Sequence, residues 1–192
     1  MTCDIILIFP SGEAEIVTPR EKATLRNTVT PSSRFLCEAM LKGIDFSEAT
    51  LIVELGGGNG VLTQHILKKM RPDARLLTFE VQANFCELLR KIDDDRLVVI
   101  EDSAEFLPKY LAEYGRKDAD HIISAIPFVI LPKPLAKSII STCRDHLAPD
   151  GRFAQLHYST ILRSMYEEIF PVTKVNFTPL NLPPAFVFHC SK

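Results

Sequence analysis

The sequence lacks the features that would mark a secreted, disulfide-bonded or metal-binding protein. Its five cysteines are widely scattered and form no Cys-x-x-Cys pair, which disfavours both a disulfide framework and a zinc site. Its five histidines show no ligand spacing such as His-x-x-x-His, so we expect no bound metal. The apolar run of residues 5–9 is too short for a signal peptide or a membrane span. We therefore expect a cytoplasmic protein with free thiols.

Neither sign of charge is in large excess. The chain has 22 basic and 24 acidic side chains, a formal net charge of −2 and a pI near 6.2. Bulk charge therefore provides no general attraction to nucleic acid or to anionic lipid, and either partner would need a local basic patch. We expect no nucleic-acid partner and at most peripheral contact with the inner surface of a membrane.

Length and composition favour one domain. A chain of 192 residues with 46% hydrophobic content can bury a sizeable core. We predict an N-terminal extension over residues 1–30, with a hairpin within residues 3–17, and a core over residues 31–192. Thr30 and Pro31 suit the cap and the first turn of a helix, and apolar residues then recur at helical spacing, so we predict a helix over residues 31–42.

From residue 51 onward, short apolar runs alternate with amphipathic segments. This alternation predicts an α/β fold, a Rossmann-like doubly wound sheet of about seven strands, mostly parallel with an antiparallel C-terminal strand. The predicted strands are residues 51–55, 76–79, 97–100, 121–124, 153–157, 174–177 and 185–189. The predicted helices are residues 61–70, 83–91, 103–113 and 133–147, and residues 149–151 predict a turn.

A glycine-rich segment follows the first of these strands. Residues 56–60 read Gly-Gly-Gly-Asn-Gly and lead directly into a predicted helix, so the chain must turn sharply at the carboxyl edge of the sheet. Glu80 ends the next strand, 20 positions beyond Gly60. An acidic side chain there can accept hydrogen bonds from both hydroxyls of a ribose. Together these features predict a pocket for an adenosine-containing cofactor.

The spacing of the glycines distinguishes between cofactors. A dinucleotide-binding fingerprint needs glycines at positions i, i+2 and i+5, but the last position is Val61 when counted from Gly56 and Thr63 when counted from Gly58. A phosphate-binding loop needs Gly-Lys-Ser or Gly-Lys-Thr, which the segment lacks. Both NAD and nucleoside triphosphates are therefore disfavoured.

The remaining pattern, Glu-x-Gly-x-Gly-x-Gly over residues 54–60, resembles the first motif of class I S-adenosylmethionine-dependent methyltransferases. The resemblance implies S-adenosylmethionine as cofactor, with Gly56, Gly58 and Gly60 against its methionine part and Glu54 near its ammonium group. Carboxylates suit this ligand, because it carries a sulfonium and an ammonium but no phosphate. The alternative is a glycine-rich turn that serves packing alone.

The resemblance extends to the ends of the second and third strands. It implies cofactor contacts at Glu80 and Val81, and an adenine contact within Asp102, Ser103 and Ala104, the nearest match to the Gly-Asp-Ala of many family members. Alternatively, Asp102 or Ser103 caps the following helix, and both roles can coexist. Which side chain meets adenine stays open.

The fourth strand ends in Ser124-Ala125-Ile126-Pro127-Phe128, the position from which class I enzymes reach the methyl acceptor. In adenine N6-methyltransferases, including ribosomal RNA dimethylases, this site reads Asn-Leu-Pro-Tyr or Asn-Pro-Pro-Tyr, and the aromatic ring stacks on the flipped base. Alignment of Pro127 and Phe128 with Pro-Tyr puts Ala125 where the amide should be. Because the amide is missing, methylation of RNA adenine is the alternative hypothesis, behind the lipid acceptor that the following segments indicate.

Other segments resemble the bacterial phospholipid N-methyltransferases, which methylate phosphatidylethanolamine. The matching segments are residues 31–36, 53–56, 124–127, 155–158 and 181–185, of which Pro-Ser-Ser-Arg and Asn-Leu-Pro-Pro-Ala are the more family-specific. Family members usually have a longer basic amphipathic helix before the first segment and a tryptophan just before the last. This chain has only Arg20, Lys22 and Arg26 there and no tryptophan, so we expect membrane docking to be weak.

The resemblance assigns roles to residues near the acceptor. We expect Tyr158 and Ser124 to act near the amine, and Ser124 also to border the cofactor. Arg34 would bind a phosphate, and the remaining substrate contacts would come from Pro127, Phe128, Tyr158 and Asn181. Three of these residues also have a structural interpretation: Tyr158 and Phe128 as packing residues and Arg34 as a solvated helix residue. A third hypothesis is a module that binds the cofactor without catalysis.

Overall fold

The computed structural model describes residues 5–8, 14–17, 30–179, 181 and 183–192. Its strands are β1 (Ile5–Ile8), β2 (Ala14–Val17), β3 (Leu51–Leu55), β4 (Arg75–Phe79), β5 (Leu97–Ile100), β6 (Ala119–Ser124), β7 (Leu147–His157), β8 (Val172–Thr178) and β9 (Ala185–Ser191). Its helices are α2 (Thr30–Leu41), α3 (Val61–Leu67), α4 (Ala83–Leu89), α5 (Leu107–Glu113), α6 (Lys133–Asp145) and α7 (Arg163–Ile169), with 3-10 turns η1 (Ala104–Phe106) and η2 (Phe128–Ile130). Strands β1 and β2 pair antiparallel as a separate two-stranded sheet.

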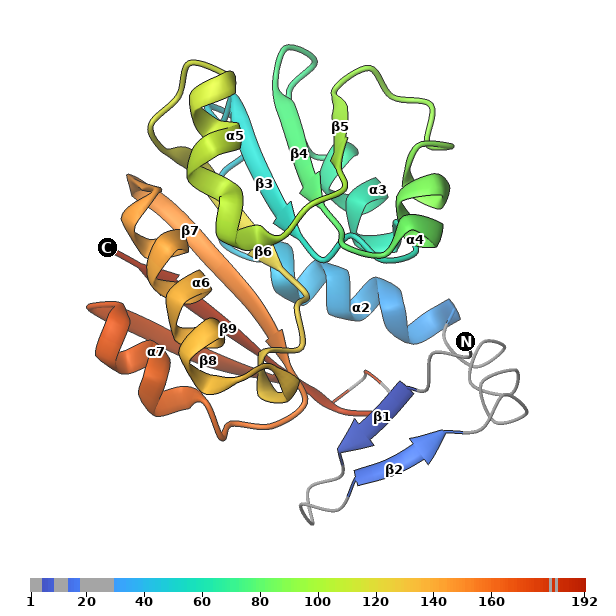
Figure 1. The fold of residues 1–192 in the computed structure, drawn as a ribbon, viewed down its shortest axis with the longest axis vertical. Coiled ribbons are helices and arrows are strands. Elements are labelled where there is room, and N and C mark those ends of the chain that lie inside the picture. The colour runs from blue at the N-terminus through green and yellow to red at the C-terminus, as the bar shows by residue number, and fades with distance from the viewer. Residues whose placement is uncertain (1–4, 9–13, 18–29, 180, 182) are drawn as a thin grey trace.

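Seven strands form one sheet in the order β5-β4-β3-β6-β7-β9-β8 (Figure 1). The pairs β5–β4, β4–β3, β3–β6 and β6–β7 are parallel, whereas β9 runs antiparallel to both β7 and β8. The predicted fold class is therefore confirmed. The chain adds β4 and β5 on one side of β3 and then returns to place β6 on the other side. The carboxyl ends of β3 and β6 thus form a topological switch point, where open α/β sheets bind their ligands.

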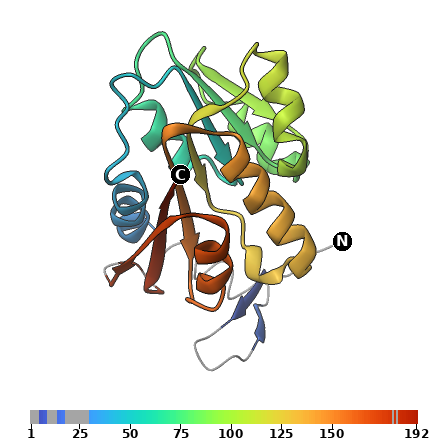
Figure 2. The same cartoon turned by 90° about the vertical axis from the view of Figure 1, so that its left-hand side faces the viewer.

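Helices cover both faces of the sheet (Figure 2). Successive side chains of β3 point to opposite faces, so Ile52 joins a core cluster with α2 and α3, and Val53 joins one with α5, α6 and α7. All five β3 residues are buried, as the continuous apolar run predicted. None of the helices in the described part of the chain is both long and apolar enough to cross a membrane.

Three local features of the structure differ from the predictions. The turn predicted at residues 149–151 lies inside β7. The register between β6 and β7 shifts between Ala119 and His121, and this bulge accommodates Pro149 while β7 stays paired on both sides of it. The helix predicted over residues 103–113 is divided into η1 and α5, with Pro108 in the first turn of α5. Helix α7 was not predicted, since seven residues show too few turns of apolar periodicity.

Candidate active site

The glycine loop lies at the switch point, between β3 and α3. The amide N–H groups of Gly56 and Gly57 both donate to the carbonyl oxygen of Phe79, at 2.8 and 3.2 Å, which ties the loop to the end of β4. A Cβ atom on Gly56 would lie 3.3 Å from Ile126, so the loop also lies against the segment after β6. The segments predicted to bind cofactor and acceptor are therefore adjacent.

Two neighbouring glycines of the loop have different surroundings. A Cβ atom on Gly57 would lie 2.4 Å from Cγ2 of Thr78, so packing excludes any side chain there. Gly58 has a φ of 52°, in the left-handed region, and a Cβ atom on it would have no heavy atom within 4 Å. Gly57 therefore has the packing role, whereas Gly58 exposes backbone to open space that a ligand can approach.

The carboxylate of Glu54 is fully buried beneath the loop. Its Oε2 accepts hydrogen bonds from the hydroxyls of Thr63 and Thr78, at 2.7 and 2.9 Å. Its Oε1 is buried and has no hydrogen-bond partner among the described residues. Burial raises the pKa of this carboxyl to about 7, although the two threonine hydroxyls act in the opposite direction. An orphaned carboxylate oxygen in such a place fits a cationic donor such as an ammonium group.

Glu80 directly follows β4 and faces the same loop. Its Oε2 accepts the amide N–H of Gly58 and its Oε1 accepts that of Gln82, both at 2.9 Å. Each carboxylate oxygen keeps a further lone pair, so Glu80 can accept hydroxyl groups while it holds the loop. The next residue, Val81, is 68% exposed and offers an apolar surface beside this carboxylate.

Side chains after β5 support one another. Asp102 accepts hydrogen bonds from the Tyr110 hydroxyl at 2.9 Å and from the amide N–H of Ser103 at 2.8 Å. The Ser103 hydroxyl caps η1 by accepting the amide N–H of Glu105 at 3.3 Å, and Ala104 is buried. The capping interpretation of Ser103 is therefore correct, and an adenine contact at this segment remains a proposal.

Ser124 lies at the end of β6, with Leu55 of β3 and Gln155 of β7 as its neighbours in the sheet. It is fully buried, and its hydroxyl accepts the amide N–H of Ile126 at 3.4 Å. The side-chain amide of Gln155 donates to the carbonyl oxygens of Ile126 and Leu156, at 2.9 and 2.6 Å. Ser124 and Gln155 thus hold the turn at the acceptor position from within the sheet. Gln155 lies in one of the segments that resemble phospholipid N-methyltransferases, but no sequence pattern distinguished it from its neighbours.

Pro127 and Phe128 face different environments. Pro127 is exposed at the end of β6, whereas Phe128 is 1% exposed and belongs to the core beneath α6. A ring with so little exposed surface cannot stack on a substrate. The substrate contact expected of Phe128 is therefore corrected to a packing role, because η2 turns its ring inward.

The structure brings Tyr158 and Asn181 together, although 23 positions separate them in the chain. Burial raises the pKa of the Tyr158 hydroxyl, and the neighbouring Asn181 side chain acts in the opposite direction. Tyr158 is nevertheless 46% exposed, while Asn181 is buried and donates to the carbonyl oxygen of Pro183 at 2.7 Å. The two residues expected to contact substrate therefore form one unit next to the end of β7.

Arg34 occupies the exposed side of α2. Its guanidinium forms an ion pair with Glu38, one turn along the helix, at 2.8 Å. Both side chains are largely exposed, as the solvated-helix interpretation expected. Its phosphate-binding role remains a proposal.

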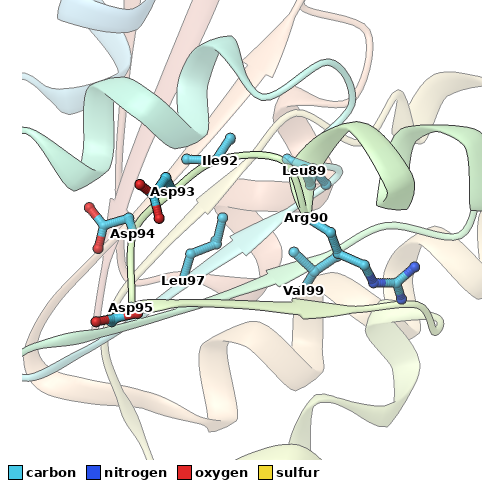
Figure 3. A pocket seen from close by; sticks show the side chains of 8 residues that line it. All are labelled: Leu89, Arg90, Ile92, Asp93, Asp94, Asp95, Leu97 and Val99. Atoms are coloured by element: carbon cyan, nitrogen blue, oxygen red, sulfur yellow. The ribbon is translucent and has the colours of Figure 1, made fainter.

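Two surface depressions are lined by none of these residues. One, of about 390 Å³, is lined by the end of α4, the acidic stretch of residues 93–95 and the start of β5 (Figure 3). The other, of about 340 Å³, lies between α6 and α7 and is lined by residues such as Lys137 and Glu168. Two of the residues that line the first, Leu89 and Ile92, pack against the glycine loop, since Cβ atoms on Gly57 and Gly60 would lie 2.8 and 2.9 Å from them. Its lining includes neither Glu54 nor Glu80 nor the turn after β6, so it is distinct from the candidate active site.

Residues 25–176 match the family model described as methyltransferase small domain. The chain belongs to this methyltransferase family. It is 31% identical over 166 residues to an ornithine lipid N-methyltransferase of Singulisphaera acidiphila, a match that covers 85% of this chain and 86% of the relative. It is also 31% identical over 175 residues to the ribosomal RNA small subunit methyltransferase A of Borreliella burgdorferi, with 77% and 59% covered.

Solved methyltransferases share the fold of this family member. A SAM-dependent methyltransferase from Aquifex aeolicus aligns with a TM-score of 0.64 at 15% identity, over 88% of this chain and 96% of the other. A precorrin-6y C5,15-methyltransferase from Geobacter metallireducens aligns with a TM-score of 0.62 at 15% identity, over 83% and 87%. The chain is an S-adenosylmethionine-dependent methyltransferase, as its glycine motif predicted.

Proposed function

We propose that this methyltransferase N-methylates the amine of a lipid, of the phosphatidylethanolamine type. The observation that carries the proposal is its similarity, over most of both chains, to a relative named ornithine lipid N-methyltransferase. The acceptor position agrees with this choice, because Ala125 supplies no side-chain amide and the ring of Phe128 is buried. An adenine would therefore lack both the hydrogen-bonding amide and the stacking ring that base methylation uses.

The residues around the glycine loop fit the cofactor. Glu54 Oε1 would accept the ammonium group, Gly58 would allow backbone to approach the methionine part, and Glu80 would accept the ribose hydroxyls. When bound, S-adenosylmethionine supplies a methyl group on a positively charged sulfur. Two nearby carboxylates favour that cationic ligand over a phosphate-bearing one.

The acceptor side must present a neutral amine in line with the methyl group. A protonated amine has no lone pair to attack, so the protein gains most from alignment and from the exclusion of water. Because its pKa is raised, the Tyr158 phenol stays protonated at neutral pH and can hydrogen-bond the amine without becoming a phenolate. The Ser124–Ile126 and Gln155–Ile126 hydrogen bonds keep the turn at the end of β6 in place.

Transfer of a labelled methyl group tests the proposal. Purified protein is incubated with methyl-tritiated S-adenosylmethionine and one acceptor: detergent-dispersed phosphatidylethanolamine, detergent-dispersed ornithine lipid, or a ribosomal RNA fragment. We expect label in phosphatidylethanolamine, loss of labelling in Glu80→Ala, and retention in Glu87→Ala, which changes an exposed carboxylate of α4. Label in ornithine lipid alone would contradict the phosphatidylethanolamine-type head group but support a lipid amine as the acceptor. Label in RNA adenine alone would overturn the proposal.

A further inference from the structure

Several exposed hydrophobic side chains lie at the carboxyl edge of the sheet, where β6, β7 and β8 end. Val129 and Ile130 follow β6, Ile161 follows β7 and Phe177 lies near the end of β8, with exposed fractions of 37%, 54%, 76% and 56%. A single exposed apolar residue needs no explanation, but four on neighbouring segments at one edge indicate an interaction surface. We call these four side chains the docking rim.

Strand directions place the docking rim beside the candidate active site. Strands β6 and β7 run parallel to β3, and β8 runs the same way because β7 and β8 are both antiparallel to β9. The register aligns Phe177 with Phe186, and Phe186 with His157, the residue before Tyr158. Both views draw the segments after β6 and β7 at the same end of the sheet (Figures 1 and 2). The rim therefore borders the acceptor side of the site.

The segments that carry the docking rim have no acidic residues. Asp and Glu are absent from residues 121–144, 151–166 and 169–192. Residues 121–192 as a whole contain seven basic and four acidic side chains, a formal charge of +3, although the whole chain has −2. Lys133, three residues after Ile130, is exposed at the start of α6. Arg144, Arg152 and Lys192 lie toward the other end of the strands, so Lys133 is the cation placed beside the rim, and this half of the edge is apolar with little charge.

Acidic residues lie elsewhere. Asp145 and Asp150 are at the opposite end of α6 and β7, while Glu167 and Glu168 form ion pairs with Arg163 and Lys137. The acids at the carboxyl edge instead follow β4 and β5, on the cofactor side: Glu80, Glu101, Asp102 and Glu105. Among the described residues from Thr30 onward, the edge is therefore divided into an acidic half beside the cofactor and an acid-free half beside the acceptor.

The composition of the rim favours a lipid surface over RNA. An RNA interface concentrates Lys and Arg with aromatic rings that stack on bases. Three of the four rim residues are aliphatic, and the transfer of aliphatic side chains from water to the boundary between head groups and acyl chains is favourable. The absence of acid avoids repulsion from anionic head groups, and each nearby cation adds an attraction that salt weakens.

We propose that the docking rim inserts into the surface of an anionic membrane and so presents the acceptor half of the active site to the lipid. This inference rests on the proposed function only in its identification of a lipid acceptor. It assigns membrane contact to the connections after β6 and β7 and to Phe177 of β8, and not to the basic residues that precede α2.

Vesicle binding with matched variants tests the proposal. Flotation measures the bound fraction with vesicles of phosphatidylcholine, with and without phosphatidylglycerol. We expect the wild-type protein to bind the anionic vesicles. The double variant Ile130→Glu/Ile161→Glu should partition roughly tenfold less or more weakly still, since two aliphatic side chains that enter the membrane are replaced by carboxylates, which have the same sign of charge as the head groups. Val172→Glu is the control, because Val172 is 43% exposed at the opposite end of β8.

A fluorescent probe gives a second measurement that does not depend on disruptive variants. The chain has no tryptophan, so Ile161→Trp and Val172→Trp each introduce a single indole. On addition of anionic vesicles, emission of the Ile161→Trp protein should shift to shorter wavelength, whereas that of Val172→Trp should stay constant. Both substituted side chains are exposed, so we expect both proteins to fold.

The results separate this inference from the proposed function. Equal vesicle binding by wild type and the rim variant, or an unshifted Ile161→Trp emission, would overturn the docking proposal even if detergent-dispersed lipid is methylated. Rim-dependent vesicle binding without methylation of any lipid amine would support docking and contradict the proposed acceptor. Rim-dependent binding to the ribosomal RNA fragment, with none to vesicles, would overturn the docking proposal in favour of RNA.

Discussion

The carboxylate of Glu80 accepts the amide N–H of Gly58 at 2.9 Å, so the residue expected to bind ribose also holds the glycine loop. Its other oxygen accepts the amide N–H of Gln82, at the start of α4. Two backbone donors thus fix the orientation of the carboxylate before any ligand arrives. Such preorganisation reduces the entropy lost when the cofactor binds.

Removal of this carboxylate should weaken cofactor binding strongly. Glu80→Ala removes the acceptor of two ribose hydroxyls and of the Gly58 amide, so we expect S-adenosylhomocysteine to bind about 1.5 to 3 kcal/mol more weakly. Isothermal titration calorimetry measures the change, with Glu87→Ala as the control. A folded Glu80→Ala protein with wild-type affinity would exclude Glu80 from the pocket.

Alanine at Gly57 should mainly lower folding stability, whereas alanine at Gly58 should mainly weaken cofactor binding. Gly58→Ala adds a Cβ atom to open space at a positive φ, so it should cost only about 1 to 2 kcal/mol of folding stability while it blocks the cofactor. Gly57→Ala should mainly unfold the protein, because the new atom meets Thr78 at 2.4 Å. Thermal melts and S-adenosylhomocysteine titrations distinguish the effects. Normal affinity in Gly58→Ala would contradict close approach of a ligand to this loop.

Sequence patterns predicted the parts of the site that depend on strand ends. The apolar run of β3, the glycines after it and Glu80 one strand later place a loop and a carboxylate at the same sheet edge, since neighbouring parallel strands end together. This relationship needs only strand order and direction. The structure then adds the hydrogen bond between Glu80 and Gly58.

Contacts between distant segments could not be predicted in this way. The threonine pair that holds Glu54 and the proximity of Tyr158 to Asn181 depend on how strands and connections pack in three dimensions. Phe128 follows a proline at a strand end, and no local periodicity indicates whether its ring points to solvent or to the core. Sequence alone therefore predicted which strand ends carry the candidate site but not how the side chains of its acceptor side are oriented.

The raised pKa of Glu54 should make stability depend on pH. The folded pKa is about 7 against 4.5 for an ordinary glutamate carboxyl, so the folded protein binds more protons between these values. The stability of the ligand-free protein should therefore fall as the pH rises through this window and become level above it. Glu54→Gln should flatten that part of the curve. Urea unfolding at several pH values measures it, and parallel curves for both proteins would contradict the assignment.

Cofactor affinity should change with pH in the opposite direction. An ammonium group prefers the ionised Glu54 carboxylate, whose population grows as the pH rises towards and past about 7. We expect S-adenosylhomocysteine to bind roughly fivefold to tenfold more tightly at about pH 7.5 than at about pH 6. Glu54→Gln should bind more weakly and lose this dependence. A pH-dependent affinity that persists in Glu54→Gln would assign the titration to another group.

Loss of the Tyr158 hydroxyl should affect the acceptor and not the cofactor. Tyr158→Phe keeps the ring but removes a hydrogen bond to the amine, so kcat/KM for the lipid should fall about tenfold, the effect of one neutral hydrogen bond, while the Kd of S-adenosylhomocysteine stays constant. Because burial raises the pKa of this phenol, it remains protonated between about pH 7 and pH 9, and the ratio of wild-type to variant activity should be constant over that range. A ratio that increases with pH would instead indicate that the phenolate acts as a base. Tyr114→Phe, at the exposed end of α5, provides the matched control, and an equal loss of activity in both variants would remove Tyr158 from the acceptor site.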